Sequence, residues 1–391
     1  MNDLLLTLFS KYSELLKKRF SEDFTEIVST DDYMPMTLNS IEEYDKVVTV
    51  SWYTPEKERE ELTYVLSSPF DRSSLRYTSF PCVLPFSQMY PLCCIDVRNF
   101  LNQIYLFSDD YFQKSSIIDE TLRTSLDDLL CNEVCQSLVD RLASQYPGQI
   151  VQILTNVEHF ETACHELEVL LFEARSSPSA TGPITLQATE KFKAAKKQAS
   201  DRIFEVVNSK IDQLVETAEY DWMATKPAAE PSDYMKEMTR WLSDISNSVL
   251  LALPEEVKGF VYFDALSHAK DAILALPLDE SVKRITPAAV SALEVDTRYL
   301  ASFVEGLGDP LLLDNLDELT QTVALMGTDD VMEYFDVAQR NKKYGKVDPL
   351  RGQTLIGKVQ EGAQIANQSP TKPPERERFG TLGSRFRFGG S

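Results

Sequence analysis

A short stretch near the C-terminus matches the phosphate-binding loop of nucleotide-binding proteins. Residues 352–358 (GQTLIGK) satisfy the pattern GxxxxGK, in which backbone amides and a lysine hold phosphate groups. The next residue is Val359, however, where that loop needs a hydroxyl group to bind magnesium. No strand-like segment precedes the match, and Leu355, Ile356 and Val359 recur at helical spacing. We therefore interpret this stretch, including Lys358, as part of a helix.

Histidine and carboxylate patterns do not assemble a catalytic or metal site either. His159 and His165 are six residues apart, which does not place two ligands on one helix face, and the third histidine, His268, is remote in sequence. Residues 165–168 (HELE) lack the second histidine of a zinc-protease motif. Acidic pairs occur without a nearby base or nucleophile, at Asp109-Asp110, Asp127-Asp128 and Asp329-Asp330. The sequence predicts no enzyme activity, no cofactor and no metal ion.

Charge and cysteine content narrow the class of protein further. The formal net charge of −22 repels phosphate surfaces over most of the molecule, which argues against nucleic-acid binding and general binding to anionic membranes. The six cysteines form no CxxC motif, and Cys131 and Cys135 lie in a largely apolar stretch, so we expect buried free thiols in a reducing compartment. No apolar run approaches the length of a bilayer span, and no signal peptide is recognisable. We expect a cytoplasmic protein without a transmembrane segment.

Hydrophobic spacing predicts an all-α fold. Apolar residues recur at steps of three and four in residues 149–175 and again in 192–218, with a loop-like stretch at 176–183 (SSPSATGP) between them. Two long helices joined in this way predict an antiparallel hairpin. Residues 29–80 are less regular, and no segment alternates long enough to predict a sheet. Further helices are expected at residues 3–20, 85–112, 115–144, 234–253, 255–276, 287–307, 310–325, 329–341 and 349–367.

A change in composition predicts the domain boundary. Residues 224–233 (ATKPAAEPSD) contain two prolines and few large apolar side chains. We expect an N-terminal helical-bundle subdomain at 1–224 and a C-terminal one at 225–367, arranged consecutively as an elongated rod. Residues 368–391 are rich in Pro, Gly, Ser and Arg and are predicted to be a disordered tail. Its basic and phenylalanine residues leave two alternatives open, a solvated tail or one that touches a membrane or an acidic partner.

Several longer strings resemble one protein family. Residues 144–154 (SQYPGQIVQIL), continuing to 158–164 (EHFETAC), are similar to exocyst complex component 6, the Rab-effector subunit of the exocyst. Residues 203–212 (IFEVVNSKID), with 218–222 (AEYDW), and residues 262–268 (YFDALSH) extend the similarity in the same order. The chain resembles the C-terminal half of the fungal type, so the resemblance implies proteins roughly twice as long, with an N-terminal coiled-coil region that is absent here.

The resemblance implies a function in vesicle tethering. Members of the family bind the GTP-bound form of a Rab GTPase on secretory vesicles, assemble with other exocyst subunits, and act at sites of exocytosis. The family places its Rab surface on the C-terminal subdomain, on the helix that matches residues 287–307. The corresponding polar position is Glu294, where animal relatives carry an asparagine. An alternative is a helical scaffold that binds only other subunits of the complex and carries no GTPase site in this part of the protein.

The spacing within residues 287–307 also predicts which side of that helix is free. One side carries the apolar stripe and is expected to face the core; its members are Val290, Leu293, Thr297, Leu300, Val304 and Leu307. Glu294, Arg298 and Glu305 then lie beside or opposite this stripe. We nominate Glu294 and Arg298 as partner-binding residues, against the alternative of a merely solvated charged face.

Overall fold

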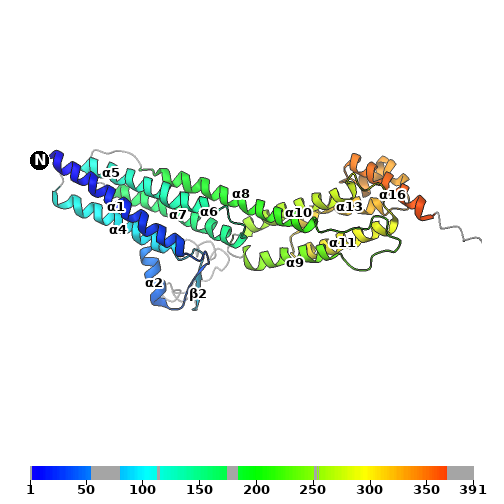
Figure 1. Ribbon diagram of the computed structural model, residues 1–391, viewed down its shortest axis with the longest axis horizontal. Helices are drawn as coiled ribbons and strands as arrows, with labels where there is room; N and C mark the ends of the chain where they lie inside the picture. Colours follow the sequence, from blue (N-terminus) through cyan, green and yellow to red (C-terminus); the bar gives the residue numbers. More distant parts are fainter. Residues whose placement is uncertain are drawn as a thin grey trace, which may run out of the picture. The chain divides into compact units, whose positions relative to one another are not determined.

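The computed structural model describes residues 2–53, 80–111, 115–173, 184–250, 253 and 255–367. Helices dominate these residues, which confirms the predicted all-α fold (Figure 1). Contacts between residues divide the chain into two compact units. The first comprises Met1–Glu216 and Glu237–Ala269, and the second comprises Thr217–Lys236 and Lys270–Ser391. The predicted tail, 368–391, and the predicted loop, 176–183, lie outside the described residues.

Four long helices build the first unit: α1 (Asn2–Thr30), α4 (Met89–Tyr111), α7 (Pro147–Glu173) and α8 (Gln187–Val215). Helix α1 packs on α4, and α7 packs along α8, which confirms the predicted pairing of the two long helices (Figure 1). Side chains from other helices cap the start of α8. The Asp127 carboxylate accepts from the Ala188 amide at 3.0 Å, and Glu168 accepts from the Leu186 amide and the Thr189 hydroxyl, each at 2.8 Å.

Residues 115–144, predicted as one helix, form three segments. These are α5 (Ser115–Asp128), the π-helix η1 (Leu129–Cys135) and α6 (Gln136–Arg141). The π-helix buries Leu129, Leu130, Val134 and Cys135, and it packs against α1 and α8. The wider turn of the π-helix lets its apolar side chains face neighbours on two sides. A hydrophobic pattern with steps of three and four residues does not indicate such a turn.

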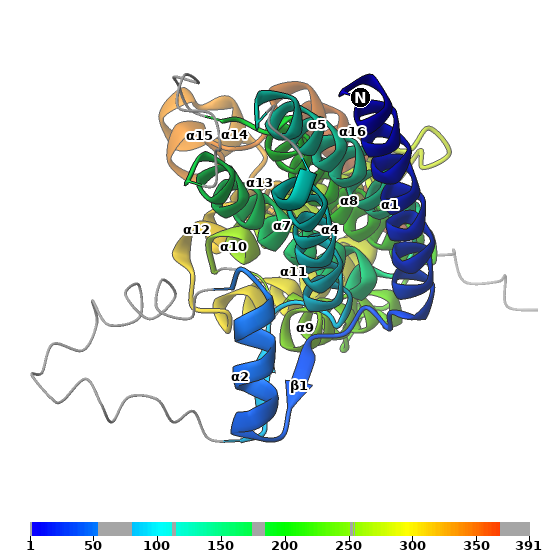
Figure 2. The ribbon, with the colours of Figure 1, turned by 90° about the vertical axis from the view of Figure 1, so that its left-hand side faces the viewer.

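A small antiparallel sheet was not predicted. Strand β1 (Met36–Leu38) pairs with β2 (Cys82–Leu84), so that Thr37 lies opposite Val83. Beside it lies α2 (Ile41–Val50), and Figure 2 shows α2 and β1 to one side of α1 and α4. A partly buried hydrogen-bond network holds this region on the bundle. Asp31 accepts hydrogen bonds from the Ser87 hydroxyl at 2.8 Å and the Met89 amide at 3.1 Å. The expectation of no sheet was therefore wrong at this one place.

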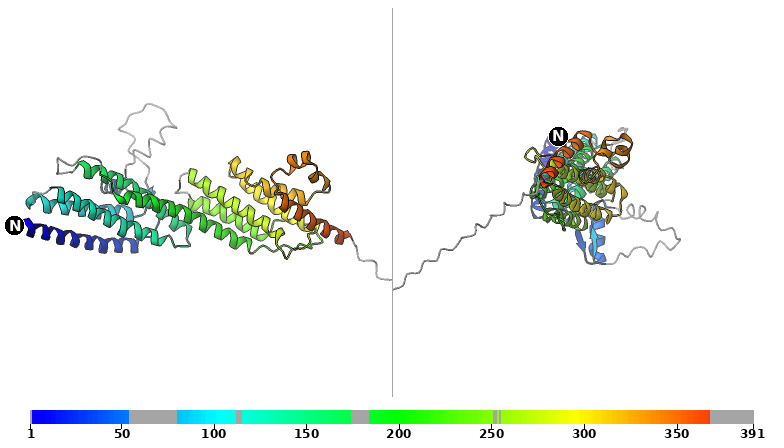
Figure 3. Two further views of the ribbon diagram at one scale, coloured as in Figure 1. Left: turned by 90° about the horizontal axis from the view of Figure 1, so that it is seen from above. Right: turned by 90° about the vertical axis from the view of Figure 1, so that its right-hand side faces the viewer.

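The second unit contains α11 (Pro287–Glu305), α12 (Pro310–Asp314), α13 (Asp317–Met326), α14 (Met332–Phe335), α15 (Val337–Lys343) and α16 (Pro349–Asn367). Helix α11 packs on α13 and α16, and α16 also packs on α13 (Figure 3). The predicted helix 310–325 is divided into α12 and α13, and the predicted helix 329–341 is divided into α14 and α15. The second division has a clear cause, because the Asp336 side chain accepts from the Ala338 and Gln339 amides at 2.8 and 3.1 Å and thereby starts a new helix.

Helices α9 (Asp233–Ser248) and α10 (Glu255–Leu278) each contribute residues to both units. The expected linker, 224–233, contains no helix before Asp233. All of this linker belongs to the second unit. The Thr286 hydroxyl donates to the Ala224 carbonyl at 2.7 Å and so connects the linker to the rest of that unit. The second long helix, predicted from the stripe at 192–218, ends at Val215. The division at 224 into two subdomains stays a prediction.

Candidate functional site

Helix α11 carries the two nominated residues, and its start is well defined by sequence. Thr286 has extended backbone angles and its hydroxyl accepts from the Ala289 amide at 3.2 Å, while Pro287 occupies the first helical position. A threonine cap followed by proline is a common way to start a helix. The threonine hydroxyl accepts from an amide of the first turn, and proline has no N–H that would need a partner.

The inward side of α11 matches the predicted stripe. Val290, Leu293, Thr297, Leu300 and Val304 are all buried, and Leu300 and Val304 are completely so. Leu307 is half-buried and lies beyond the end of the helix, which is capped at Gly306. Helix α11 is therefore held by one apolar side, and its position does not depend on the polar side.

The outward side of α11 holds Glu294 and Arg298 together. The Arg298 guanidinium donates to the Glu294 carboxylate at 2.7 Å. The Arg298 side chain is 70% exposed and the Glu294 side chain is 54% exposed. Glu305 is exposed as well, and Tyr299, next to Arg298, is 40% exposed. The nominated residues thus form an exposed ion pair on α11, and Tyr299 is exposed on the same helix, farther around from Glu294.

A buried carboxyl group on the same helix was missed at the sequence level. Asp296 is 1% exposed and accepts from the Ser232 amide and the Ser232 hydroxyl, each at 2.7 Å. It also accepts a hydrogen bond from the Tyr220 hydroxyl, whose oxygen lies 2.9 Å from the Tyr234 hydroxyl. Asp296 lies three residues after Leu293 and four before Leu300, so its helical position beside the stripe was the available signal.

The tyrosines around Asp296 remain protonated donors. Burial raises the pKa of Tyr220, and the neighbouring Tyr234 and Asp296 raise it further. Burial also raises the pKa of Tyr234. The segment before α9 is held on α11 by its hydrogen bonds to Asp296. Within the segment, the Tyr220 ring stacks on Trp222 with a centroid distance of 5.0 Å. The network positions α11 and is not itself open to a partner.

The stretch that matches a phosphate-binding loop lies wholly inside α16. Lys358 donates to the carbonyl oxygens of Pro277 and Asp279 at 2.8 and 3.0 Å, at the C-terminal end of α10. Gly352 permits close packing, since a Cβ there would lie 2.6 Å from the Tyr334 hydroxyl. The lysine and the first glycine of the match therefore serve helix packing, which agrees with the helical interpretation.

The remaining reactive side chains are held in structural roles. His159 contacts Tyr53, Phe86 and Tyr90, and burial lowers its pKa to about 4, which keeps the imidazole neutral. Four of the six free thiols are buried, as expected, whereas Cys82 and Cys131 are only half-buried. Burial raises the pKa of Cys94 to about 12 and that of Cys135 to about 11. Within the described ranges no cluster of three or more His, Cys, Asp or Glu side chains is placed to hold a metal ion.

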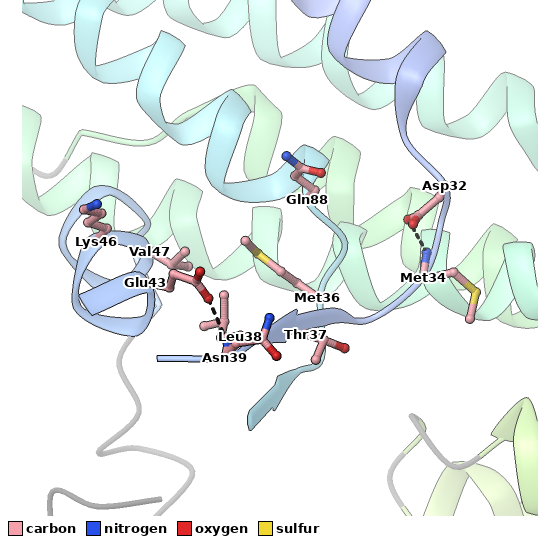
Figure 4. A pocket seen from close by; sticks show the side chains of 10 residues that line it. All are labelled: Asp32, Met34, Met36, Thr37, Leu38, Asn39, Glu43, Lys46, Val47 and Gln88. Carbon is pink, nitrogen blue, oxygen red and sulfur yellow. Dashed lines mark hydrogen bonds between the residues drawn. The ribbon is translucent and has the colours of Figure 1, made fainter. Parts of the chain in front are cut away.

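A hollow of about 530 Å³ lies between β1 and α2. Figure 4 shows Glu43, Lys46 and Val47 of α2 on one side of it and residues of the β1 segment on the other. Its two carboxylates already accept from backbone amides, Glu43 from Asn39 at 2.8 Å and Asp32 from Met34 at 3.0 Å. No base or nucleophile converges on it in the described residues, so it offers no catalytic arrangement.

A second hollow, of about 460 Å³, lies along α1 and α4. Leu15, Leu16, Phe20 and Phe100 are among the residues that line it. Asp96 also lines it, with one buried carboxylate oxygen that has no hydrogen-bond partner in the described structure. Burial and, to a lesser extent, the charge of Asp23 raise the Asp96 pKa to about 6. Arg19 and Asp23 line it too, so the hollow is a groove of mixed apolar and charged character.

None of the helices in the described ranges has the length and apolar character needed to cross a membrane.

Comparison with known proteins gives a consistent family. The family model described as "Exocyst complex subunit Sec15 C-terminal" matches residues 1–358. Exocyst complex component sec15 of Schizosaccharomyces pombe is 28% identical over 365 residues, which cover 89% of this chain and 44% of that protein. Human exocyst complex component 6B is 28% identical over 374 residues, covering 93% of this chain and 44% of that protein.

A solved structure supports the fold. The crystal structure of a Sec15 C-terminal domain superposes with a TM-score of 0.53 at 19% sequence identity, covering 83% of this chain and 98% of that one. The chain spans less than half the length of the curated relatives named above. On the match of its first 358 residues, the chain belongs to the family of exocyst complex subunit Sec15 C-terminal domains.

Proposed function

We propose that this chain is the part of an exocyst subunit that binds a GTP-loaded Rab GTPase of secretory vesicles. With other exocyst subunits it would tether these vesicles to the plasma membrane, as a cytoplasmic protein that is peripheral at vesicles and at sites of exocytosis. The observation that carries the proposal is the two-sided construction of α11. Its buried side fixes the helix, and its outward side presents Glu294, Arg298 and Tyr299 to a partner.

The outward side of α11 has the composition of a small protein interface. Arginine and tyrosine are over-represented among the residues that contribute most to binding, and charge pairs fix the register between partners. The rigid support from Asp296 and the apolar stripe lowers the ordering cost of binding, because the helix is already in place. Acid–base or metal chemistry plays no part in this proposal.

A retention experiment tests the proposed function. The full 391-residue chain is immobilised and offered secretory-vesicle Rab proteins loaded with a GTP analogue or with GDP. A Rab effector must favour the switch conformation of the GTP state, so we expect retention with the analogue and little with GDP. Equal retention in both nucleotide states, or none in either, would contradict the proposal.

A scaffold that binds only other subunits is the second candidate, and the surface of α1 favours it. Leu4, Leu8 and Leu15 are 65%, 47% and 63% exposed, and Leu15 borders the groove along α4. In this case the groove receives an amphipathic helix of another exocyst subunit. Leu8→Ser with Leu15→Ser would then reduce co-purification of the other subunits, with no GTP-dependent retention of any Rab in the unaltered chain.

A further inference from the structure

Two consecutive short helices of the second unit expose apolar side chains. Met332 and Phe335 of α14 are 71% and 54% exposed, and Val337, the first residue of α15, is 60% exposed. Basic residues follow directly, with Arg340, Lys342 and Lys343 in the last turn of α15 and Lys346 just beyond it. We call Met332, Phe335, Val337, Lys342 and Lys346 the apolar–basic surface.

Packing within the unit does not explain these exposed side chains. Tyr334 is the inward residue of α14 and belongs to a buried cluster with Leu325, Tyr344, Val347 and Ile356. Met332 and Phe335 are three residues apart and share a helix face that excludes Tyr334. Helix α15 buries none of its residues. The segment is therefore anchored through its tyrosines, while its apolar side chains face outward.

The charges of this segment separate into paired and free ones. Lys343 forms an ion pair with Glu333 at 2.8 Å, and Arg340 lies over the Tyr334 ring at 6.0 Å. The Asp336 carboxylate is engaged by the first amides of α15, and the Asp330 carboxylate accepts from the Met332 amide at 3.0 Å. Asp329, just before α14, is an exposed acidic residue. Lys342 and Lys346 are exposed, and neither side chain has a partner within the described residues. Cations at a helix C-terminus also stabilise the helix dipole, but that role requires no exposed phenylalanine or methionine.

We propose that the apolar–basic surface docks on the surface of an anionic phospholipid bilayer. The apolar side chains would enter the boundary between headgroups and acyl chains, and Lys342 and Lys346 would lie at the level of the lipid phosphates. A fluid bilayer accepts side chains that project outward, whereas a folded partner needs a matching shape. Because the net charge is −22, anionic lipid repels the rest of the protein surface, and this local contact would set the orientation of the protein on the bilayer.

Vesicle sedimentation with the full chain tests the proposal. The probes are vesicles of phosphatidylcholine mixed with phosphatidylserine, and vesicles of phosphatidylcholine alone. We expect sedimentation with the anionic vesicles to exceed that with the neutral ones. Lys342→Gln with Lys346→Gln should lower the partition coefficient roughly 25-fold, since each basic residue near anionic lipid contributes about fivefold. Phe335→Ser with Met332→Ser should lower it on both vesicle types, because it removes inserted apolar area.

Matched variants control for charge and hydrophobicity. Lys193→Gln with Lys197→Gln removes the same charge from exposed positions of α8, and Leu311→Ser removes a side chain that is 67% exposed on α12. Both should sediment like the unaltered chain. Equal losses in the control and test variants would overturn the proposal, as would the absence of any vesicle binding. Binding that disappears only when the chain ends at Asn367 would overturn it too, by assigning the contact to the tail.

Discussion

Arg298 donates a hydrogen bond to the Glu294 carboxylate one helical turn earlier, at 2.7 Å. The two residues nominated for partner contact therefore neutralise each other's charge while no partner is bound. Most of the Arg298 side chain and more than half of the Glu294 side chain are exposed. Exposed pairs at this spacing contribute only about 0.3–0.5 kcal/mol to stability. The pair can thus be rearranged by a partner at little cost to the fold.

Exchanging the two charges separates surface pattern from stability. Glu294→Arg with Arg298→Glu keeps an ion pair at the same spacing, so the free energy of unfolding should change by less than about 0.5 kcal/mol. Leu300→Asp is the contrast, because it places an unpaired charge at a fully buried position and should unfold the second unit. Thermal melts measure both. If the charge exchange lowers the melting temperature as much as Leu300→Asp does, the buried side of α11 has been misassigned.

Loss of the Asp296 carboxyl group should destabilise the second unit strongly. Asp296→Ala leaves the Ser232 amide and hydroxyl and the Tyr220 hydroxyl without their acceptor in a buried place. We expect a loss of about 3–5 kcal/mol in urea unfolding, the range for breaking a buried polar network. Tyr234→Phe removes only one outer hydroxyl and should cost about 1 kcal/mol. Equal effects of the two substitutions would show that Asp296 does not organise the network.

Lys358→Ala should affect folding and leave nucleotide binding unchanged. The lysine donates to two carbonyl oxygens at the end of α10, so its removal should cost about 1–2 kcal/mol in thermal or urea unfolding. Neither the unaltered chain nor the variant should bind ATP or GTP measurably in calorimetry. Micromolar nucleotide binding that disappears in Lys358→Ala would overturn the assignment of residues 352–358 to a structural helix.

Asp96 predicts a specific pH dependence of stability. Its pKa is raised to about 6 in the folded chain, against about 3.9 in an unfolded one, so the folded state binds more protons between these values. Stability therefore falls as pH rises through this window, and the penalty is complete above pH 6. Asp96→Asn should stabilise the protein at pH 7 by about 1 kcal/mol, a figure reduced for partial exposure, and by nothing near pH 4. A gain in urea unfolding that is the same at both pH values would contradict this origin.

The long, regularly spaced helices could be predicted from sequence because their stripes are local. The apolar stripes of α7 and α8 predicted both helices and their pairing. The spacing of Leu355, Ile356 and Val359 predicted that the phosphate-loop match lies on a helix. The nominated residues Glu294 and Arg298 emerged on the outward side of α11 for the same reason. Whether they bind a partner stays a prediction.

Features set by distant contacts could not be predicted. Strands β1 and β2 are three residues each and pair across a long stretch of chain, so neither shows alternation by itself. The π-helix η1 and the break at Asp336 depend on packing and capping that a hydrophobic pattern does not record. The burial of Asp296 depends on Tyr220 and Ser232, which lie more than sixty residues earlier.

The affinity of the chain for a GTP-loaded secretory Rab, measured by calorimetry, tests the role of α11 most directly. Glu294→Arg with Arg298→Glu should weaken binding by roughly 1–3 kcal/mol, because central charges at an interface then oppose their partners. A matched control exchanges Glu237 and Arg240, an exposed ion pair on α9, and should keep full affinity. Unchanged affinity after the exchange at 294 and 298, in a protein with an unchanged melting temperature, would contradict the assignment of α11 as the docking face.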